Sequence, residues 1–451
     1  MRQIKYILCF FVLSIIYTHT NAQNGINSPY SRYGFGMQSD QSMGFNKGMA
    51  GVAQGFRDGQ IINMSNPASY SAVDSLTALF DFGFTLQNAN LKLDNLQKNL
   101  HNTSFDYIAF HFRGFKNVGF TLGLQPYSNI DYSFESNSET IPGTESTSTS
   151  YTFFGNGGIH QLVFGTGVRP FRPLSLGVNI GYLFGDYNHY SLMAFDDNTV
   201  FPMLRRYNAY IGTYKLDAGF QLTLPLSKKL ELTVGGTYGL GHEIKNRAIR
   251  TTMTVGAGTY SVSSLISSTS TSELTDNSSD TIRNAFQLPH SFSAGFALRY
   301  AQKWEIGADF QYEMWNKCKF PNQAADGTYT TQKGLLNNKY RVALGGSFTP
   351  KRLSYKLGAY YSQPYAQADL SGTVTDKPQE FGITAGVSIP IYNKNIWYNS
   401  PRINISAGWT HSSIPYLNAL TNNQSKITEN YLRLNIGITF SERWFYKWKV
   451  Q

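Results

Sequence analysis

The stretch Trp304 to Met314 reads WEIGADFQYEM, and its side chains change character at every step. Every second residue is apolar or aromatic: Trp304, Ile306, Ala308, Phe310, Tyr312 and Met314. The residues between them are polar or small: Glu305, Gly307, Asp309, Gln311 and Glu313. Because successive side chains of a β-strand point to opposite faces, this period of two predicts a strand with one apolar and one polar face.

The same alternation recurs along most of the chain. Leu216 to Leu224 and Leu432 to Phe440 repeat it, and runs of this length are uncommon many times over in soluble sandwiches. We predict strands near 76–87, 106–113, 118–133, 160–169, 174–186, 209–225, 230–245, 291–300, 304–314, 340–349, 355–361, 379–389, 402–410 and 430–440. The count is about fourteen, an even number as in single-chain bacterial outer-membrane barrels.

The connections between these strands alternate in length. The short ones are 114–117, 170–173, 226–229, 301–303 and 350–354, and they carry Lys or Arg but no Asp or Glu. The long ones are 88–105, 134–159, 187–208, 246–290, 315–339, 362–378 and 411–429. Barrels of this class have short periplasmic turns and long external loops. The sequence therefore predicts an all-β protein, a transmembrane antiparallel β-barrel of about 14 strands, whose basic rim faces the periplasm and the anionic headgroups there.

Composition excludes two other classes of protein. Past the first residues, no apolar run reaches the length of about 18 residues that a transmembrane helix needs, so a helical membrane protein is excluded. The formal charge is +10, or +8 without Arg2 and Lys5, but the basic residues are spread out rather than gathered on one element. This distribution argues against a nucleic-acid partner.

The chain begins like an exported protein. Arg2 and Lys5 precede an apolar run from Ile7 to Tyr17 that is broken by one serine, and Thr20-Asn21-Ala22 offers small residues for cleavage. We expect residues 1–22 to be a signal peptide, which directs the mature chain to the outer membrane of a Gram-negative bacterium. Cys318 is then the one cysteine left, so no disulfide can form within the chain.

Residues 23–75 do not alternate, and we expect them to form an N-terminal hatch or plug inside the barrel, residues 76–440. Gly48-Met49-Ala50-Gly51-Val52-Ala53, then Asp58 and Asn66-Pro67-Ala68, resemble the hatch of the FadL-type transporters of long-chain fatty acids and hydrophobic compounds. Later features are similar too: Leu288-Pro289, Trp304 to Asp309, Trp315, Arg341 and Gly345. The resemblance implies a fourteen-stranded barrel, and uptake through the hatch and a kinked third strand that opens sideways into the bilayer.

Two candidate sites have alternative interpretations. Asn66, Pro67 and Ala68 either contact the ligand or form the bend where the hatch joins the first strand, because Pro fixes φ and Asn tolerates turns. Pro126, which lacks an N–H, interrupts the third strand. With Gly123 and Gln125 it either marks a lateral opening, against which we expect Asn66-Pro67-Ala68 to lie, or ends the strand.

A third candidate is the set of charges expected on the water-facing side. Lys215, Asp217, Glu305, Asp309 and Arg433 either attract a carboxylate substrate or brace the barrel and its hatch. The histidines are scattered, and no residues have the spacing of metal ligands. We therefore expect no catalytic residues, no metal and no cofactor.

Together these features predict a passive outer-membrane channel for hydrophobic small molecules or lipids, possible substrates including long-chain fatty acids. The alternative is a non-transporting barrel that serves as a subunit of an outer-membrane secretion or assembly complex, with other outer-membrane proteins as partners. Residues 441–451 form an extension after the last predicted strand, and this extension slightly favours the alternative.

Overall fold

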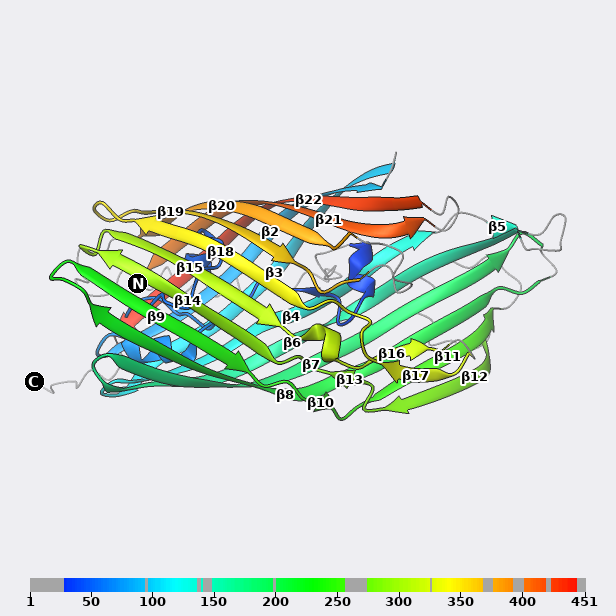
Figure 1. Cartoon of the computed structure of the whole chain (residues 1–451), viewed down its shortest axis with the longest axis horizontal. Helices are drawn as coiled ribbons and strands as arrows, with labels where there is room; N and C mark the ends of the chain where they lie inside the picture. The colour runs from blue at the N-terminus through cyan, green and yellow to red at the C-terminus, as the bar shows by residue number, and fades with distance from the viewer. Residues whose placement is uncertain are drawn as a thin grey trace, which may run out of the picture.

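The computed structural model describes residues 28–93, 96–135, 139–140, 148–197, 200–255, 274–324, 327–367, 376–391, 401–418 and 423–443. Within them, fourteen antiparallel strands close into one barrel, which confirms the predicted fold class (Figure 1). They are β2 (Thr77–Leu93), β3 (Leu96–Phe115), β4 (Val118–Glu135), β6 (Ser148–Phe171), β7 (Leu174–Phe195), β8 (Met203–Pro225), β9 (Leu230–Gly239), β14 (Ser291–Tyr300), β15 (Trp304–Glu313), β18 (Lys339–Phe348), β19 (Ser354–Gln363), β20 (Gln379–Pro390), β21 (Arg402–Asn418) and β22 (Asn423–Arg443). The barrel closes where β22 pairs with β2, from Thr77 opposite Arg443 to Leu93 opposite Ile427.

Several strands extend well past their predicted ends. The strand predicted at 106–113 is β3, Leu96–Phe115, and the one predicted at 160–169 is β6, Ser148–Phe171. The added parts lie beyond the apolar band, where no lipid selects one face, so the alternation that marks a strand is lost there. The end of β22 at Arg443 likewise lies three residues past the predicted end at Phe440.

The long connections hold further short elements. The largest is the hairpin of β11 (Arg247–Val255) and β12 (Leu274–Arg283), and β11 continues the sheet by pairing with β8 at Ala248 opposite Ala209. The others are β5 (Glu139–Thr140), β10 (Glu243–Ile244), β13 (Phe286–Gln287), η3 (Trp315–Lys317), β16 (Phe320–Gln323) and β17 (Tyr329–Gln332).

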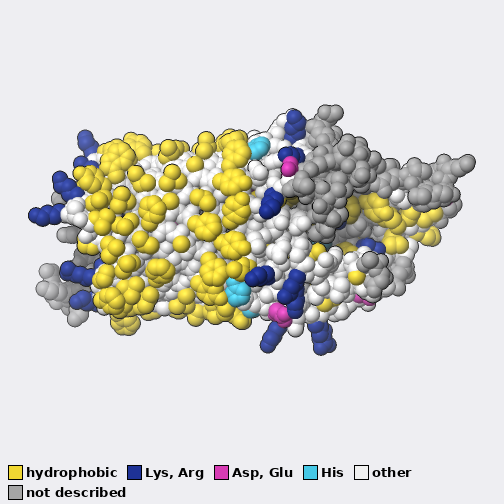
Figure 2. Space-filling model, viewed as in Figure 1, with side chains coloured by type: hydrophobic (Ala, Val, Ile, Leu, Met, Phe, Trp, Pro, Cys, Tyr) yellow, Lys and Arg dark blue, Asp and Glu magenta, His cyan; other side chains and the backbone are white. Residues whose placement is uncertain are grey.

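Exposed large apolar side chains lie on every strand of the barrel. On the face drawn in Figure 2 they form a band that is bounded at one end by Lys and Arg side chains. The register of β15 is the predicted one, because Phe310 is 48% exposed on the outside while Asp309, at 3%, points inward. Band and rim are the arrangement expected of a barrel with a lipid-facing exterior. In the described part of the chain, no helix is long and apolar enough to cross a membrane.

Residues 28–75, called the N-terminal segment below, pack inside the barrel (Figure 1). The segment contains η1 (Pro29–Arg32), β1 (Met37–Gln38), α2 (Gly44–Lys47) and η2 (Pro67–Ala72). Its apolar side chains form two cores with the wall, one around Met43 and Met64, the other around Met49 and Phe56. The interior of the barrel is therefore a packed core over much of its length.

A third apolar core lies at the end opposite the basic rim. Phe35 of the N-terminal segment is fully buried there against Phe286, Trp315 and Phe320, with ring centroids 5.5, 6.0 and 4.9 Å away. Tyr365 stacks on Trp315 at 4.6 Å. The long connections at this end thus fold over the barrel and hold the N-terminal segment in place.

Candidate functional site

The N-terminal segment touches the wall at a set of inward-facing glycines, called the glycine seat below. Its members lie on seven strands, β4, β6, β7, β8, β9, β18 and β19: Gly119, Gly167, Gly177, Gly219, Gly235, Gly345 and Gly358. A Cβ atom at Gly235 would lie 2.0 Å from the carbonyl oxygen of Gln54, and one at Gly345 would lie 2.4 Å from that of Met49. Such close backbone contact is possible only where the wall carries no side chain.

The Asn66-Pro67-Ala68 motif lies at the seat on β6, β7 and β8. The Oδ1 atom of Asn66 accepts a hydrogen bond from the Ala68 N–H at 3.1 Å, which caps η2, and Pro67 takes the first helical position. The Nδ2 atom of Asn66 donates to the carbonyl oxygens of Gln54, at 3.0 Å, and Phe220, at 3.1 Å. The fully buried amide thus joins two parts of the N-terminal segment to β8.

The region of Pro126 rules out one of the two expectations, that the third strand ends there, and leaves the lateral opening untested. The third strand does not end there, because β4 continues to Glu135 and stays paired with β6 through Gln125–Gln161, Pro126–His160 and Ser128–Ile159, with Tyr127 as a bulge. On its other side, pairing with β3 stops at Ile108 opposite Leu124. Farther along that edge β4 pairs instead with β1, where Met37 lies opposite Asn129 and Gln38 opposite Ser128. The wall is therefore separated between β3 and β4, and the N-terminal segment lies at the separation.

Gly123 and Gln125 face the N-terminal segment, but not the Asn66 motif that we expected beside Pro126. A Cβ atom at Gly123 would lie 2.7 Å from the Sδ atom of Met64. Gln125 donates to the Oε1 atom of Gln41 at 2.5 Å, and Gln41 donates to the carbonyl oxygen of Pro126 at 2.9 Å. That a ligand passes here remains a prediction.

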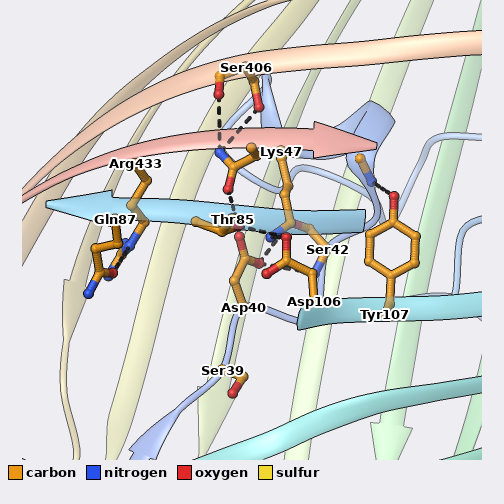
Figure 3. Close-up of polar contacts among 12 residues, drawn as sticks. Ser39, Asp40, Ser42, Lys47, Thr85, Gln87, Asp106, Tyr107, Ser406 and Arg433 are labelled. Atoms are coloured by element: carbon orange, nitrogen blue, oxygen red, sulfur yellow. Dashed lines mark hydrogen bonds and ion pairs between the residues drawn. The ribbon is translucent and has the colours of Figure 1, made fainter. Parts of the chain in front are cut away.

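A buried ion pair, which we did not predict, joins the N-terminal segment to the wall (Figure 3). The Nζ atom of Lys47 lies 2.9 Å from Asp106 Oδ2, and the two side chains are 5% and 10% exposed. Thr85 donates to the same carboxylate at 2.6 Å. Asp106 is the extra residue of a bulge in the β2–β3 ladder, so that it and Tyr107 both point inward. The one sequence signal for this bulge was the pair of successive polar residues, Asp106 and Tyr107, at the start of the strand predicted at 106–113.

Two further side chains near this pair, Tyr107 and Asp40, also form hydrogen bonds. The Tyr107 hydroxyl accepts the Gly44 N–H at 2.8 Å and donates to Asp81 at 3.1 Å. Asp40 accepts from the backbone N–H and the hydroxyl of Ser42, at 3.0 and 2.7 Å. Burial opposes the charge on Asp40, but Lys47, Arg341 and Ser42 outweigh it and lower its pKa. The N-terminal segment thus carries a carboxylate that its surroundings keep ionised.

The predicted lumen charges do not form one site. Lys215 and Asp217 pair with each other, and Arg433 donates to Gln87 at 2.8 Å. Glu305 accepts from Arg299 at 2.8 Å. Asp309 accepts the backbone N–H groups of Ala53 and Gln54, at 2.6 and 3.0 Å. Each of these groups is held by other groups of the protein, and Asp309 holds the N-terminal segment itself.

A cavity of about 380 Å³ lies between the N-terminal segment and the wall. Charged side chains of both signs line it: Asp40, Lys47, Asp106, Lys215, Asp217, Glu313, Lys339, Arg341, Glu380 and Arg433. Apolar and aromatic side chains, among them Met64, Phe105, Leu288 and Ile414, line it as well, so the cavity is mixed in character. Among the described residues, no group of three or more His, Cys, Asp or Glu side chains could hold a metal ion.

Comparison with known proteins gives a family and a fold. A protein-family model described as BamG matches residues 3–451, and none of the curated proteins matches the sequence significantly. A FadL homologue from Pseudomonas aeruginosa has a similar structure, with a TM-score of 0.60 at 11% identity over 88% of this chain and 98% of its own. The toluene transporter TodX of P. putida gives 0.56 at 12% over 89% and 98%. The monoaromatic hydrocarbon channel CymD gives 0.56 at 13% over 90% and 98%. At such low identity, these structures show a shared fold.

Proposed function

The chain belongs to the BamG family, and from this and from the geometry of its lumen we propose that it is a subunit of an outer-membrane secretion or assembly complex. Its place would be the outer membrane of a Gram-negative bacterium, after removal of the signal peptide at residues 1–22. The observation that carries the proposal is the seating of the N-terminal segment against seven strands of the wall. A barrel filled in this way presents its surfaces to partners, and the same fold can serve unrelated functions.

Transport through the lumen would require the N-terminal segment to move. That movement would break the Lys47–Asp106 pair, and separating a buried ion pair costs about 3–5 kcal/mol. It would also remove the partners of Asp309 and of the Asn66 amide, which would then have to be hydrated. These costs favour a barrel whose lumen stays occupied by the N-terminal segment while the protein functions.

The lumen cavity among the described residues is not a purely apolar site, because charged side chains of both signs lie among its apolar ones. An apolar molecule there would displace water from these charged groups without replacing its hydrogen bonds. The apolar core at the external end is filled by Phe35, Trp315 and other side chains of the chain itself. Both observations support a role in binding partners over one in uptake.

The second candidate is a channel for hydrophobic compounds, with long-chain fatty acids as the substrate that the resemblance implies. The separation of β3 from β4 beside Gly123, Gln125 and Pro126 favours it, because a wall can open sideways only where its strand ladder is interrupted. A ligand would then pass between the N-terminal segment and β4 into the bilayer. The fold shared with the FadL homologue and TodX supports this candidate too.

Purification of the full-length chain from native membranes in a mild detergent separates the two candidates. A subunit retains other outer-membrane proteins in a fixed ratio, and these should remain bound through size-exclusion chromatography. A channel elutes without such proteins and carries lipids or fatty acids that mass spectrometry identifies. The second result would contradict our proposal.

A further inference from the structure

Five basic side chains gather at one part of the rim of short turns. They belong to β3, β6, the two turns beside them and the N-terminal segment: Arg57, Arg113, Lys116, Arg169 and Arg172. The two turns are tied together by a hydrogen bond from the backbone N–H of Arg169 to the carbonyl oxygen of Asn117, at 2.9 Å. Arg57 donates to Ser71 at 3.0 Å and Arg113 to Ser75 at 2.8 Å, so both guanidinium groups lie along the same short part of the N-terminal segment.

None of these five groups forms an ion pair within the described residues. Each lies more than 4.0 Å from any Asp or Glu oxygen there, whereas Arg299, which donates to the carbonyl oxygen of Arg57 at 2.7 Å, lies 2.8 Å from Glu305. Their recorded partners are neutral oxygens, such as the Ser175 hydroxyl for Arg57, at 2.5 Å, and the Arg172 carbonyl for Arg169, at 2.9 Å. These bonds hold the guanidinium groups of Arg57, Arg113 and Arg169 in place without neutralising them, and Glu231 only partly offsets the charge of Arg57.

Arg57 and Arg169 are close enough to repel each other. Burial and then repulsion by Arg169 lower the pKa of Arg57 to about 10, although Glu231 partly opposes the shift. Arg57 still carries its charge at neutral pH. A surface that carries one sign of charge attracts ions of the opposite sign.

The side of the wall on which these groups lie indicates what they bind. The β6–β7 ladder is irregular between Val168 and Phe171, but Arg169 lies close enough to Arg57 of the N-terminal segment to repel it, which places its charge at the mouth of the lumen. The same holds for Arg113, whose neighbour Phe112 packs with Phe120 on the outer surface. A ligand reaches this mouth from the aqueous compartment beside the short turns, which we predict to be the periplasm, more directly than from the lipid headgroups.

We propose that Arg57, Arg113, Lys116, Arg169 and Arg172 form a docking site for an acidic segment of a periplasmic partner protein. Guanidinium groups bind carboxylates through paired, charge-assisted hydrogen bonds, and complementary charge speeds association and sets its orientation. The proposal rests on the proposed function, since it names the chemistry of one partner of the complex. It places that partner where the N-terminal segment and the wall are both within reach.

The test uses the full-length protein in a neutral detergent and a fluorescein-labelled oligoglutamate peptide, with binding followed by anisotropy. The variant Arg113→Gln/Arg169→Gln should bind about tenfold more weakly than the unmodified protein, a loss of about 1.4 kcal/mol. The matched control, Lys228→Gln/Lys229→Gln, removes the same charge from another short turn and should bind as the unmodified protein does. An unchanged heat-dependent shift on SDS gels shows that each variant is folded.

Three results would overturn the proposal: no saturable binding, an equal loss in the control variant, or dependence on these arginines for phosphatidylglycerol in mixed micelles but not for the peptide. The test is independent of co-purification. If no proteins co-purify while the peptide still binds through Arg113 and Arg169, the proposed complex is wrong and the site stands. If proteins co-purify and the peptide does not bind, only the docking site is wrong.

Discussion

At the scale of single residues, neighbours on one strand meet opposite surroundings. Phe310 faces lipid, while Gln311 lines the cavity. Phe310→Asp should therefore destabilise the folded barrel by about 1–2 kcal/mol, because it places a carboxylate in the apolar band, and Gln311→Asp should be tolerated. Denaturant unfolding in phospholipid vesicles measures both variants. Equal losses would mean that the register of β15 is shifted by one residue.

The Lys47–Asp106 pair makes a second prediction at this scale. Lys47→Met should lower the free energy of unfolding by about 3–5 kcal/mol, since it leaves Asp106 buried without its counter-charge. The control is Lys47→Met/Asp106→Asn, which removes both charges and should recover most of the loss. If the single variant unfolds like the unmodified protein, the pair does not hold the N-terminal segment.

The glycine seat is tested by adding one methyl group. In Gly235→Ala the new Cβ atom would lie 2.0 Å from the Gln54 carbonyl oxygen, so we expect a loss of about 1–3 kcal/mol from overpacking. Gly408→Ala is the matched control, since its Cβ atom would meet nothing closer than 3.3 Å. Equal stability of the two variants in the same unfolding measurement would show that the N-terminal segment does not touch the wall at Gly235.

At the scale of elements, the sequence predicts the strands whose one face contacts lipid, and it misses the bulges and the hairpin, which depend on local packing. Each predicted strand matches one strand of the barrel, because residues such as Ile306 and Phe310 must alternate with polar ones to face lipid. The bulges at Asp106 and Tyr127 were not predicted, because a bulge leaves only a local break in the alternation, such as the successive polar residues Asp106 and Tyr107. The hairpin of β11 and β12 lies beyond the band, where no face is selected.

The candidate site was predicted less well for a related reason. A sequence motif identified Asn66, Pro67 and Ala68. The glycines that they contact could not be told from other small residues in the sequence, because only the structure shows how close they lie to the N-terminal segment. The lumen charges were recognised as inward-facing, but alternation cannot show that Asp309 accepts backbone N–H groups whereas Lys215 and Asp217 pair with each other. Such contacts depend on how the N-terminal segment folds, and the strand pattern does not determine that.

At the scale of the whole molecule, the basic rim predicts orientation (Figure 2). Lys228 lies in a short turn and Lys333 in a long connection at the opposite end. In a Cys318→Ser background, Lys333→Cys should react with a membrane-impermeant maleimide on intact cells, and Lys228→Cys should react only after the outer membrane is permeabilised. Labelling of Lys228→Cys on intact cells would reverse the orientation and place the proposed docking site outside the cell.

We propose that the barrel serves as a subunit while its N-terminal segment stays seated against the wall. Gln38 and Ser128 are paired across β1 and β4, and Cα atoms of such antiparallel partners lie about 4.5–5.5 Å apart, within the range of a disulfide. The variant Gln38→Cys/Ser128→Cys, with Cys318→Ser, can therefore lock the segment to the wall beside the β3–β4 separation.

The most direct measurement compares uptake of a labelled long-chain fatty acid and recovery of co-purifying outer-membrane proteins in oxidised and reduced cells that carry this variant. We predict that oxidation changes neither, because a subunit needs its N-terminal segment seated and no ligand passes β4. Loss of fatty-acid uptake on oxidation, with recovery on reduction, would contradict the account and identify the protein as a channel.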